Sequence, residues 1–375
     1  MKKVISIVLN DFVNDSRVLK EATSLASSGY KVTVVALHND ELPEREVLQG
    51  IDVHRIKLVS RNWSKMTPIK LLKYLELSIK MIKKYKEIDI IHCNDIGPLP
   101  IAYIIKTLTK NKVKIIYDAH EYETEMNGLK GLRKKVVSII ERFLINKVDK
   151  VITVSNSIAN EYVRLYNIEK PGLVLNCPHY KEISAHDKFR EKFLIEKNVK
   201  IFLYQGSLTK GRGLELILEV FTTIHKEAVL VVMGYGPLVQ TVVSYSEKYS
   251  NIFYHEAVSP DVLLQYTSSA DIGICLIEDV CLSYRYSLPN KFFEYAMAGL
   301  PIITNNLIEV KQIAEKYRCG WVMKEDSPNI LKGLVNEIVD MDLEPIKENV
   351  KRMTKEYNWE NQEKVLLNIY AGVHK

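Results

Sequence analysis

The sequence predicts an α/β protein of two similar domains in tandem, each a parallel sheet with helices on both faces. Three observations support this fold class. The chain has 375 residues, more than one hydrophobic core usually organises. Short β-branched runs alternate with amphipathic stretches of helical length, as they do in parallel sheets. The alternation stops near residue 178 and restarts near residue 199, as though at a new first strand.

The first half contains apolar runs with the length and composition of buried strands. They cover residues 4–9, 31–37, 52–59, 89–93, 113–121, 150–155 and 172–178. Between the first two runs, the spacing of apolar residues predicts a helix. Asn14, Asp15 or Ser16 can cap its start, and Gly29 can end it. We therefore predict one complete N-terminal domain, residues 1–180.

The second half repeats the pattern. Its apolar runs cover residues 201–206, 228–234, 251–257, 271–277, 301–306 and 320–323. Residues 181–198 are polar and lack periodicity, which predicts a linker before a second domain at 199–355. A last helix over residues 359–370 has no strand after it. We expect the segment 356–375 to pack back on the first domain.

Composition excludes several classes of protein. A formal net charge of +6 is too small for this length to favour a nucleic-acid-binding protein. The five cysteines are scattered without a C-x-x-C pair, so neither a disulfide framework nor a zinc site is predicted. No stretch reaches the roughly 18 apolar residues that cross a bilayer, and Asn10 and Asp11 interrupt the N-terminal apolar run too early for a signal peptide. We expect a cytoplasmic protein without a bound metal.

A glycine-rich loop follows the first strand of the second half, in the segment YQGSLTKGRGLELILEV. Gly206, Ser207, Lys210 and Arg212 stand between this strand and the next helix. Backbone N–H groups at a helix start, together with an arginine and a lysine, are suited to binding phosphate. A glycine-rich turn with solvated basic side chains explains the segment equally well.

A second candidate segment is SLPNKFFEYAMAGLPII, in which Pro289 can begin a helix and Gly299 can end it. Asn290, Lys291 and Glu294 are three or four residues apart and share one helix face. A carboxylate there can accept both hydroxyls of a ribose, and the lysine beside it can contact phosphate. The alternative is a surface ion pair on a helix whose aromatic residues pack in the core.

This pair of segments resembles the donor site of the family-four retaining glycosyltransferases, and the similarity extends over essentially the whole chain. The matching pieces are QGSLTKGRG, MGYGP and FEYAMAGLP, and the LPNK sequence resembles that of one subgroup. The resemblance implies the GT-B fold, in which two Rossmann-like domains face a central cleft and the C-terminal helix crosses back to the first domain. It also implies that Arg212 and Lys291 contact a diphosphate and that Glu294 contacts the ribose.

The resemblance also implies which other residues bind the nucleotide. They are Gly206, Ser207, Lys210, Gly234, Ser287 and Asn290. The family's first glutamate would fall eight residues before Glu294, where this chain has Tyr286. In the family that glutamate contacts the donor sugar. The candidates to make this contact here are the neighbours Ser283, Tyr284 and Ser287. The acidic residues Glu278 and Asp279 are further candidates, which would require a longer loop.

In the first half, His120 ends the predicted strand 113–121, at the edge where ligands collect in such sheets. The resemblance implies that it contacts the donor sugar or its phosphate, whereas a lone histidine is more often structural. His92 and Asp95 end a neighbouring strand and are weaker candidates. Asn14, Asp15 and Arg17 follow the first strand and can line an acceptor pocket, although a helix cap explains them almost as well.

The expected activity is transfer of a hexose or N-acetylhexosamine from a nucleotide sugar to a hydroxyl of a cell-surface glycan or lipid-linked acceptor. Retention, metal independence and a UDP donor are what the resemblance implies, and no further cofactor is expected. The first turn reads VLNDFVNDS and lacks G-x-G-x-x-G, which argues against a nicotinamide-dependent oxidoreductase. Two alternatives stay open: a UDP-sugar epimerase of the same fold, and a non-catalytic nucleotide-sugar-binding subunit of a polysaccharide assembly complex.

The stretch from residue 61 to residue 86 mixes apolar residues with basic ones, mainly lysines. Glu76 is its single acidic residue. Such a helix can lie on a membrane with anionic lipids. It can equally be an ordinary amphipathic helix whose lysines are solvated. Peripheral association with the inner face of the cell membrane is therefore an open expectation.

Overall fold

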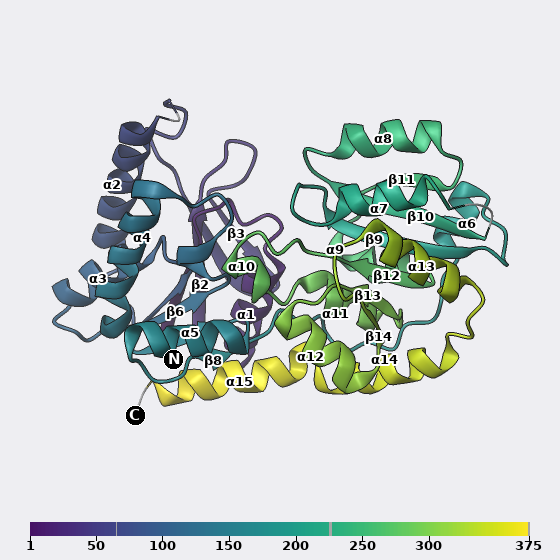
Figure 1. Cartoon of the computed structure of the whole chain (residues 1–375). Helices are drawn as coiled ribbons and strands as arrows, with labels where there is room; N and C mark the ends of the chain where they lie inside the picture. The colour runs from purple at the N-terminus through teal and green to yellow at the C-terminus, as the bar shows by residue number, and fades with distance from the viewer. Residues whose placement is uncertain (65, 225–226, 374–375) are drawn as a thin grey trace. The chain divides into compact units, whose positions relative to one another are not determined.

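The computed structural model describes residues 1–64, 66–224 and 227–373. Lys65, part of the basic stretch, lies outside the described residues. The chain divides into two compact units (Figure 1). The first unit comprises Met1–Val174 and Glu363–Lys375, and the second comprises Leu175–Gln362. Each contains one sheet.

The sheet of the first unit has the strand order β3-β4-β2-β1-β5-β6-β7-β8. Its strands are β1 (Lys3–Ile7), β2 (Lys31–Leu37), β3 (Arg45–Leu48), β4 (Ile51–Ile56), β5 (Ile90–Asn94), β6 (Lys114–Ala119), β7 (Lys150–Thr153) and β8 (Gly172–Leu173). All pair in parallel except β3, which is antiparallel to β4. The sequence did not predict β3, because this short edge strand, REVL, carries charges and leaves Val47 exposed.

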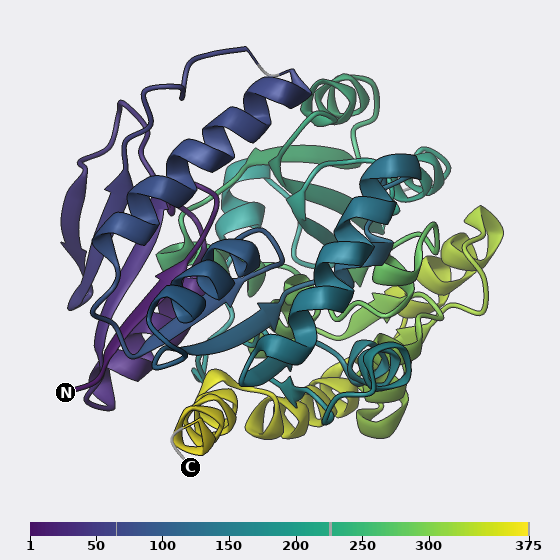
Figure 2. The same ribbon diagram turned by 90° about the vertical axis from the view of Figure 1, so that its left-hand side faces the viewer.

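The helices of the first unit are α1 (Ser16–Ser27), α2 (Thr67–Lys84), α3 (Leu99–Leu108), α4 (Gly131–Leu144) and α5 (Asn156–Tyr166), with two short 3-10 turns at Glu123–Glu125 and Ile145–Lys147. Helices α2, α3 and α4 lie in one layer over the sheet, with α3 packed against both others (Figure 2). Of the three candidate caps for α1, Asp15 is the N-cap, because its Oδ1 accepts a hydrogen bond of 3.2 Å from the Val18 N–H. Gly29 follows the helix with φ of 90°, a conformation that glycine adopts without strain.

The sheet of the second unit is wholly parallel, in the order β11-β10-β9-β12-β13-β14. Its strands are β9 (Lys200–Ser207), β10 (Ala228–Tyr235), β11 (Ile252–Glu256), β12 (Ile272–Cys275), β13 (Ile302–Thr304) and β14 (Gly320–Val322). Side chains alternate along β9, so that Ile201 and Leu203 pack in one apolar cluster and Phe202 and Tyr204 in another. The sheet is therefore buried on both faces, as the apolar runs predict.

The helices of the second unit are α6 (Lys188–Phe193), α7 (Leu214–Phe221), α8 (Val239–Lys248), α9 (Pro260–Thr267), α10 (Leu282–Arg285), α11 (Asn290–Met297), α12 (Ile308–Tyr317), α13 (Pro328–Val339) and α14 (Glu344–Glu356). The unit begins at Leu175, whereas the sequence placed the domain boundary after residue 180. The region 181–198, expected as a linker, includes α6, whose Phe189 is buried in the core of this unit. Phe193 and Ile195 of the same region also pack against that core, although most residues around them are polar.

The last helix, α15 (Trp359–Gly372), belongs to both units. In the second unit, the backbone N–H of Trp359 donates to the Pro178 carbonyl at 2.8 Å, and Gln362 accepts from the Leu175 N–H at 2.9 Å. In the first unit, Tyr370 is fully buried. The expected return of this helix to the first domain is confirmed. Among the residues that the structure describes, no helix is long and apolar enough to span a bilayer.

Candidate functional site

The predicted phosphate loop lies where β9 and β10 end side by side. Gly206 and Gly234 are paired across the two parallel strands. A Cβ atom added to Gly234 would meet the Gly206 carbonyl oxygen at 1.9 Å, so no other residue fits there without displacing the backbone. Ligands of doubly wound sheets bind beyond these carboxyl ends. The glycines of the motif therefore position the end of β9 and the loop that follows it.

Arg212 and Lys210 lie on this loop, ahead of α7. Lys210 is exposed. The Arg212 guanidinium lies over the Tyr284 ring, 4.7 Å from Cζ to the ring centroid. Its Nε is buried and has no hydrogen-bond partner among the described residues. Gly213, with φ of 70°, caps α7 in a conformation that favours glycine. The guanidinium of Arg212 is thus held against the Tyr284 ring, and its Nε–H remains able to donate a hydrogen bond to a ligand.

Lys291 lies in the first turn of α11 and is almost wholly buried. Its Nζ lies 3.8 Å from the centroid of the Tyr204 ring and, among the described residues, has no hydrogen-bond partner. Burial lowers the pKa of this amine to about 8, and the nearby charge of Arg212 also lowers it. A buried ammonium that faces a second cation is costly unless an anion joins the site. The geometry therefore fits a phosphate group.

Glu294, one turn along α11, is held from β9. Gln205 Nε2 donates to Glu294 Oε2 at 2.7 Å, and Thr267 Oγ1 lies 2.7 Å from Gln205 Oε1. The hydrogen bond from Thr267 orients the side-chain amide of Gln205, and the amide N–H then holds the Glu294 carboxylate in place. Asn290, which shares the helix face, is exposed at the start of α11. Lys291 and Glu294 thus both contact the second half of β9.

The turn that leads into α11 holds the residues expected to replace the missing glutamate. Ser287 Oγ donates to the Tyr284 carbonyl at 2.8 Å, which closes the turn. Ser283 is buried in the short helix α10, and Tyr286 caps its end. The ring of Tyr284, in the same turn, lies against the Arg212 guanidinium. Ser207, at the end of β9, is exposed and accepts through its carbonyl from the Tyr204 hydroxyl at 3.1 Å.

In the first unit, His120 follows β6 and is held by two carboxylates. Its Nε2 lies 3.1 Å from Asp118 Oδ2, and its backbone N–H donates to Asp95 Oδ1 at 3.2 Å. Burial alone would lower its pKa, but the Asp118 charge and hydrogen bond outweigh burial and raise it to about 9. The imidazole is therefore protonated at neutral pH. One-fifth of the side chain remains exposed, enough for contact with a ligand.

Arg17 and His92 belong to a buried charge cluster beneath His120. Arg17 is 4% exposed and forms a bidentate pair with Asp118, in which Nε donates to Oδ2 at 3.2 Å and Nη2 donates to Oδ1 at 2.9 Å. The expectation that Arg17 lines an acceptor pocket is therefore wrong. Glu21, His92 and Asp118 have ligand atoms close enough to hold a metal ion. The Arg17 guanidinium already contacts both carboxylates, and Asp118 also pairs with His120, so cations of the protein itself occupy these ligands.

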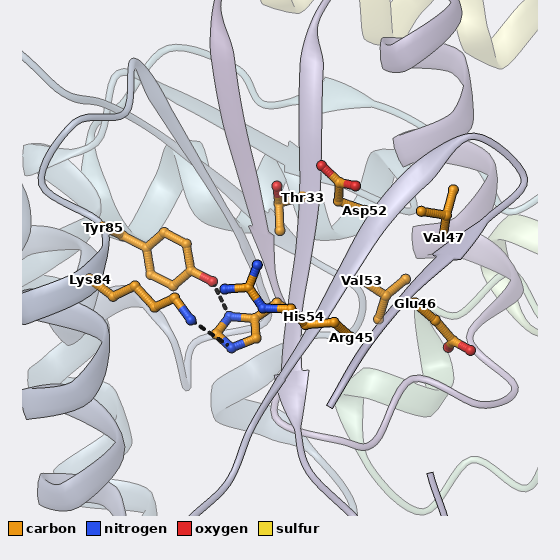
Figure 3. Close-up of a pocket in the computed structure, with 9 residues that line it drawn as sticks. All are labelled: Thr33, Arg45, Glu46, Val47, Asp52, Val53, His54, Lys84 and Tyr85. Atoms are coloured by element: carbon orange, nitrogen blue, oxygen red, sulfur yellow. Dashed lines mark hydrogen bonds between the residues drawn. The ribbon is translucent and has the colours of Figure 1, made fainter. Parts of the chain in front are cut away.

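A separate cavity of about 350 Å³ lies at the edge of the first sheet (Figure 3). Its walls are Thr33, Arg45, Glu46, Val47, Asp52, Val53, His54, Lys84 and Tyr85. The Lys84 Nζ lies 2.9 Å from His54 Nε2, and the Tyr85 hydroxyl contacts His54 Nδ1. Burial, Lys84 and Arg45 lower the pKa of His54 to about 4, so the imidazole is neutral. None of the predicted site residues lines this cavity.

Three supporting residues were missed by the sequence reasoning. Tyr204 and Gln205 lie in the second half of β9, where the alternation of side chains predicts which face each one is on but not which residue it contacts. Asp118 was detectable, because it precedes His120 by two residues near the end of a strand and therefore shares its side of the sheet.

Comparisons with known proteins agree with this architecture. Residues 16–176 match the family model described as Glycosyltransferase Family 4, and residues 185–358 match Glycosyl transferases group 1. An uncharacterized glycosyltransferase of Methanocaldococcus jannaschii is 24% identical over 372 residues, which cover 93% of this chain and 91% of that protein. The O-antigen biosynthesis glycosyltransferase WclY of Escherichia coli is 24% identical over 59% of this chain and 62% of its own length.

Among solved structures, HepE of Anabaena in complex with UDP-glucose superposes with a TM-score of 0.76 at 12% identity, over 99% of this chain and 100% of that one. This likeness shows the shared fold. Because the two family models between them match most of both units, and the fold agrees with them, the chain is a family-four-like glycosyltransferase with the GT-B fold.

Proposed function

We propose that the protein transfers a hexose or N-acetylhexosamine from a UDP-sugar to an acceptor hydroxyl, with retention of configuration and without a metal ion. One observation carries this proposal: Lys291 and Arg212, from two separate segments, are held against tyrosine rings with buried nitrogen atoms that lack partners among the described residues. A diphosphate would supply those partners. The solved relative with bound UDP-glucose supports the choice of UDP.

In this proposal the second unit binds the donor. Lys291, Arg212 and Lys210 bind the diphosphate, Glu294 accepts the ribose hydroxyls, and Gly206, Ser207, Gly234, Ser287 and Asn290 line the nucleotide. As the bond between the anomeric carbon and the diphosphate breaks, negative charge grows on the leaving oxygen. Fixed cations stabilise that charge without reorganising, the part that a metal has in other enzymes. The protonated His120 of the first unit contacts the donor sugar or its phosphate.

The acceptor binds the first unit and attacks from the face that the diphosphate leaves. Its hydroxyl proton passes to the leaving phosphate oxygen, so the products are a glycoside and UDP, and no protein nucleophile is required. We propose that the acceptor is a cell-surface glycan or a lipid-linked precursor at the inner face of the cell membrane. The relative named for O-antigen biosynthesis supports this class of acceptor.

The test is a nucleotide-release assay over UDP-, GDP- and ADP-sugars, run with and without EDTA. We expect turnover of a UDP-sugar that EDTA does not reduce. Lys291→Ala should lower kcat/KM by about a hundredfold or more, because a charge contact of the transition state is lost. The matched control is Lys351→Ala, which removes an exposed lysine of the same unit. Equal loss in both variants, or none, would contradict the assignment of the site.

Two outcomes would replace the proposal. Conversion of a UDP-sugar to its epimer in the absence of any acceptor would identify an epimerase. UDP binding without turnover of any donor, across a panel of acceptors, would indicate a non-catalytic subunit, for which Tyr286 in place of the family's first glutamate is the motivating observation.

A further inference from the structure

Helix α11 is held against the end of β9 by more than packing. The pairing of β12 with β9 ends at Gly273 and Leu203. Beyond it, the backbone N–H of Gln205 donates to the Tyr295 hydroxyl at 2.9 Å, and that hydroxyl donates to the Ile274 carbonyl at 3.3 Å. A Cβ atom on Gly273 would lie 2.3 Å from the Tyr295 ring, so the ring occupies space that only glycine leaves. Tyr295 therefore fixes α11 relative to both strands.

The side chain of Gln205 makes a second connection to α11. It is 1% exposed, its Nε2 lies 2.7 Å from Glu294 Oε2, and its Oε1 lies 2.7 Å from Thr267 Oγ1. An ionised carboxylate only accepts hydrogen bonds, so the amide N–H must face Glu294 and the amide oxygen must face Thr267. The Thr267 hydroxyl also lies 2.9 Å from the Leu263 carbonyl, but its single proton must point to Gln205, because an amide oxygen cannot donate. The donors and acceptors of this network thus have one consistent assignment.

The network orders a side chain that a ligand can reach. Glu294 is partly exposed, whereas Gln205 and Thr267 are buried. A free glutamate side chain samples several rotamers and loses that freedom when a ligand binds. A carboxylate has about four acceptor positions, of which Gln205 takes one. Glu294 is therefore preorganised to accept hydrogen bonds from neighbouring hydroxyls of a ligand.

We propose that Gln205 is a positioning residue that presets Glu294 for the two ribose hydroxyls, so that the site selects a ribonucleotide over one without those hydroxyls. This inference rests on the proposed function, in which Glu294 accepts the ribose hydroxyls, and adds the residue that holds it. Gln205 acts through Glu294 and not on the ligand directly. Because the ribose contact is the same in the bound donor and in the transition state, Gln205 contributes to donor binding and not to the chemical step.

The test compares two ligands by calorimetry on the full-length chain: UDP, and its dideoxy analogue, which lacks both ribose hydroxyls. The wild-type protein should bind UDP more tightly. Gln205→Met has similar bulk but no amide, and it should weaken UDP binding by about tenfold, because Glu294 loses a charge-assisted hydrogen bond. Binding of the analogue should hardly change. Gln312→Met is the matched control, since Gln312 is exposed on α12 of the same unit.

Two further variants separate positioning from a merely structural role. Thr267→Val removes only the hydroxyl that orients the amide, and it should weaken UDP binding by about threefold with the same selectivity. In a Glu294→Ala background, Gln205→Met should cost no further UDP affinity, because no carboxylate remains to be positioned. Thermal melts verify folding, and Thr267→Val carries the test if Gln205→Met does not fold. In the nucleotide-release assay, Gln205→Met should raise KM and leave kcat within about twofold.

The inference is overturned if Gln205→Met weakens UDP and the analogue equally, or if its cost persists in the Glu294→Ala background. A wild-type protein that binds both ligands equally well would contradict the ribose contact of Glu294 and the role of Gln205 together. The proposed reaction fails separately. Selective UDP binding without turnover of any donor contradicts only the reaction, and turnover with an unselective loss in Gln205→Met contradicts only the role of Gln205.

Discussion

At the scale of single residues, the candidate donor site is defined by what its cations lack. Lys291 and Arg212 are each stacked on a tyrosine ring, which stabilises a cation without consuming its hydrogen-bond donors. The pKa of Lys291 is lowered by burial, so the amine holds its proton less tightly than a solvated lysine does. A site of this kind gains most when an anion arrives, because the ligand restores both charge balance and hydrogen bonds.

This arrangement predicts a pH dependence of UDP binding. The pKa of Lys291 is about 8 in the free protein, and a bound diphosphate must raise it. Below pH 8 the lysine is already charged and affinity should be flat. Above it, binding must also take up a proton, so the association constant should fall by up to about tenfold per pH unit. Calorimetric titrations between about pH 7 and pH 9 measure this, and Lys291→Arg should bind without the decline. An equal decline in both proteins would assign it to another group.

The Asp118–His120 pair predicts a second titration. Because the pKa of His120 is raised above its ordinary value of 6.5 to about 9, its contribution to stability is complete below pH 6.5 and is lost as pH rises through 9. Asp118→Asn should lower that pKa, since burial and Arg17 would then dominate. NMR titration of the ring protons measures the shift. Asp95→Asn leaves the ion pair between Arg17 and Asp118 intact, so it should shift the pKa of His120 less. It serves as the control variant. An unchanged pKa in both variants would contradict the pairing.

At the scale of elements, one buried carboxylate joins α4, α5 and β6. Glu141 accepts hydrogen bonds from the hydroxyls of Tyr117, Tyr162 and Tyr166 at 2.6, 2.8 and 2.5 Å. Burial raises its pKa, and the three hydroxyls oppose that rise. The alternation of the chain predicted a helical stretch between β6 and β7, but nothing in the spacing of Glu141 indicated that it points inward.

Replacing this carboxylate should destabilise the first unit. Glu141→Leu leaves three buried hydroxyls without an acceptor, and we expect a loss of about 3 to 5 kcal/mol in its free energy of unfolding. Glu141→Gln keeps one acceptor oxygen and should lose less. Calorimetry of the two variants checks the order, with Glu169→Gln as the control, because the Glu169 side chain is 89% exposed in the same unit. A Leu variant as stable as the wild type would mean that the tyrosines find other partners.

At the scale of the whole molecule, α15 is, among the described helices and strands, the one whose residues divide between the two compact units. Its end in the first unit is held by Tyr370, which is buried, packs edge-on against Tyr30 and lies 2.8 Å through its hydroxyl from His92 Nδ1. The sequence predicted the return of this helix from the absence of a following strand, but it offered no reason to choose Tyr370 as the anchor.

Tyr370→Ala should therefore release the end of α15 from the first unit, with a cost of about 3 to 5 kcal/mol for the cavity. Tyr370→Phe keeps the packing and should lose only about 1 kcal/mol with the hydrogen bond. Hydrogen exchange of the amides in 363–373 measures the release. If exchange there stays slow in the Ala variant while the unit as a whole is destabilised, the helix is held by other contacts.

The sequence by itself determined the two-domain α/β class, the strands and the helix that carries Lys291 and Glu294, because periodicity, β-branched runs and turn residues are local properties of the chain. It could not determine β3, the anchoring of α6, the burial of Arg17 or the partners of Gln205. Each of those depends on what the opposite side of an element meets after folding, and a local pattern is the same for a face that meets the core, a ligand or the solvent. Tertiary structure alone decided that Arg17 pairs with Asp118 and that Gln205 holds Glu294.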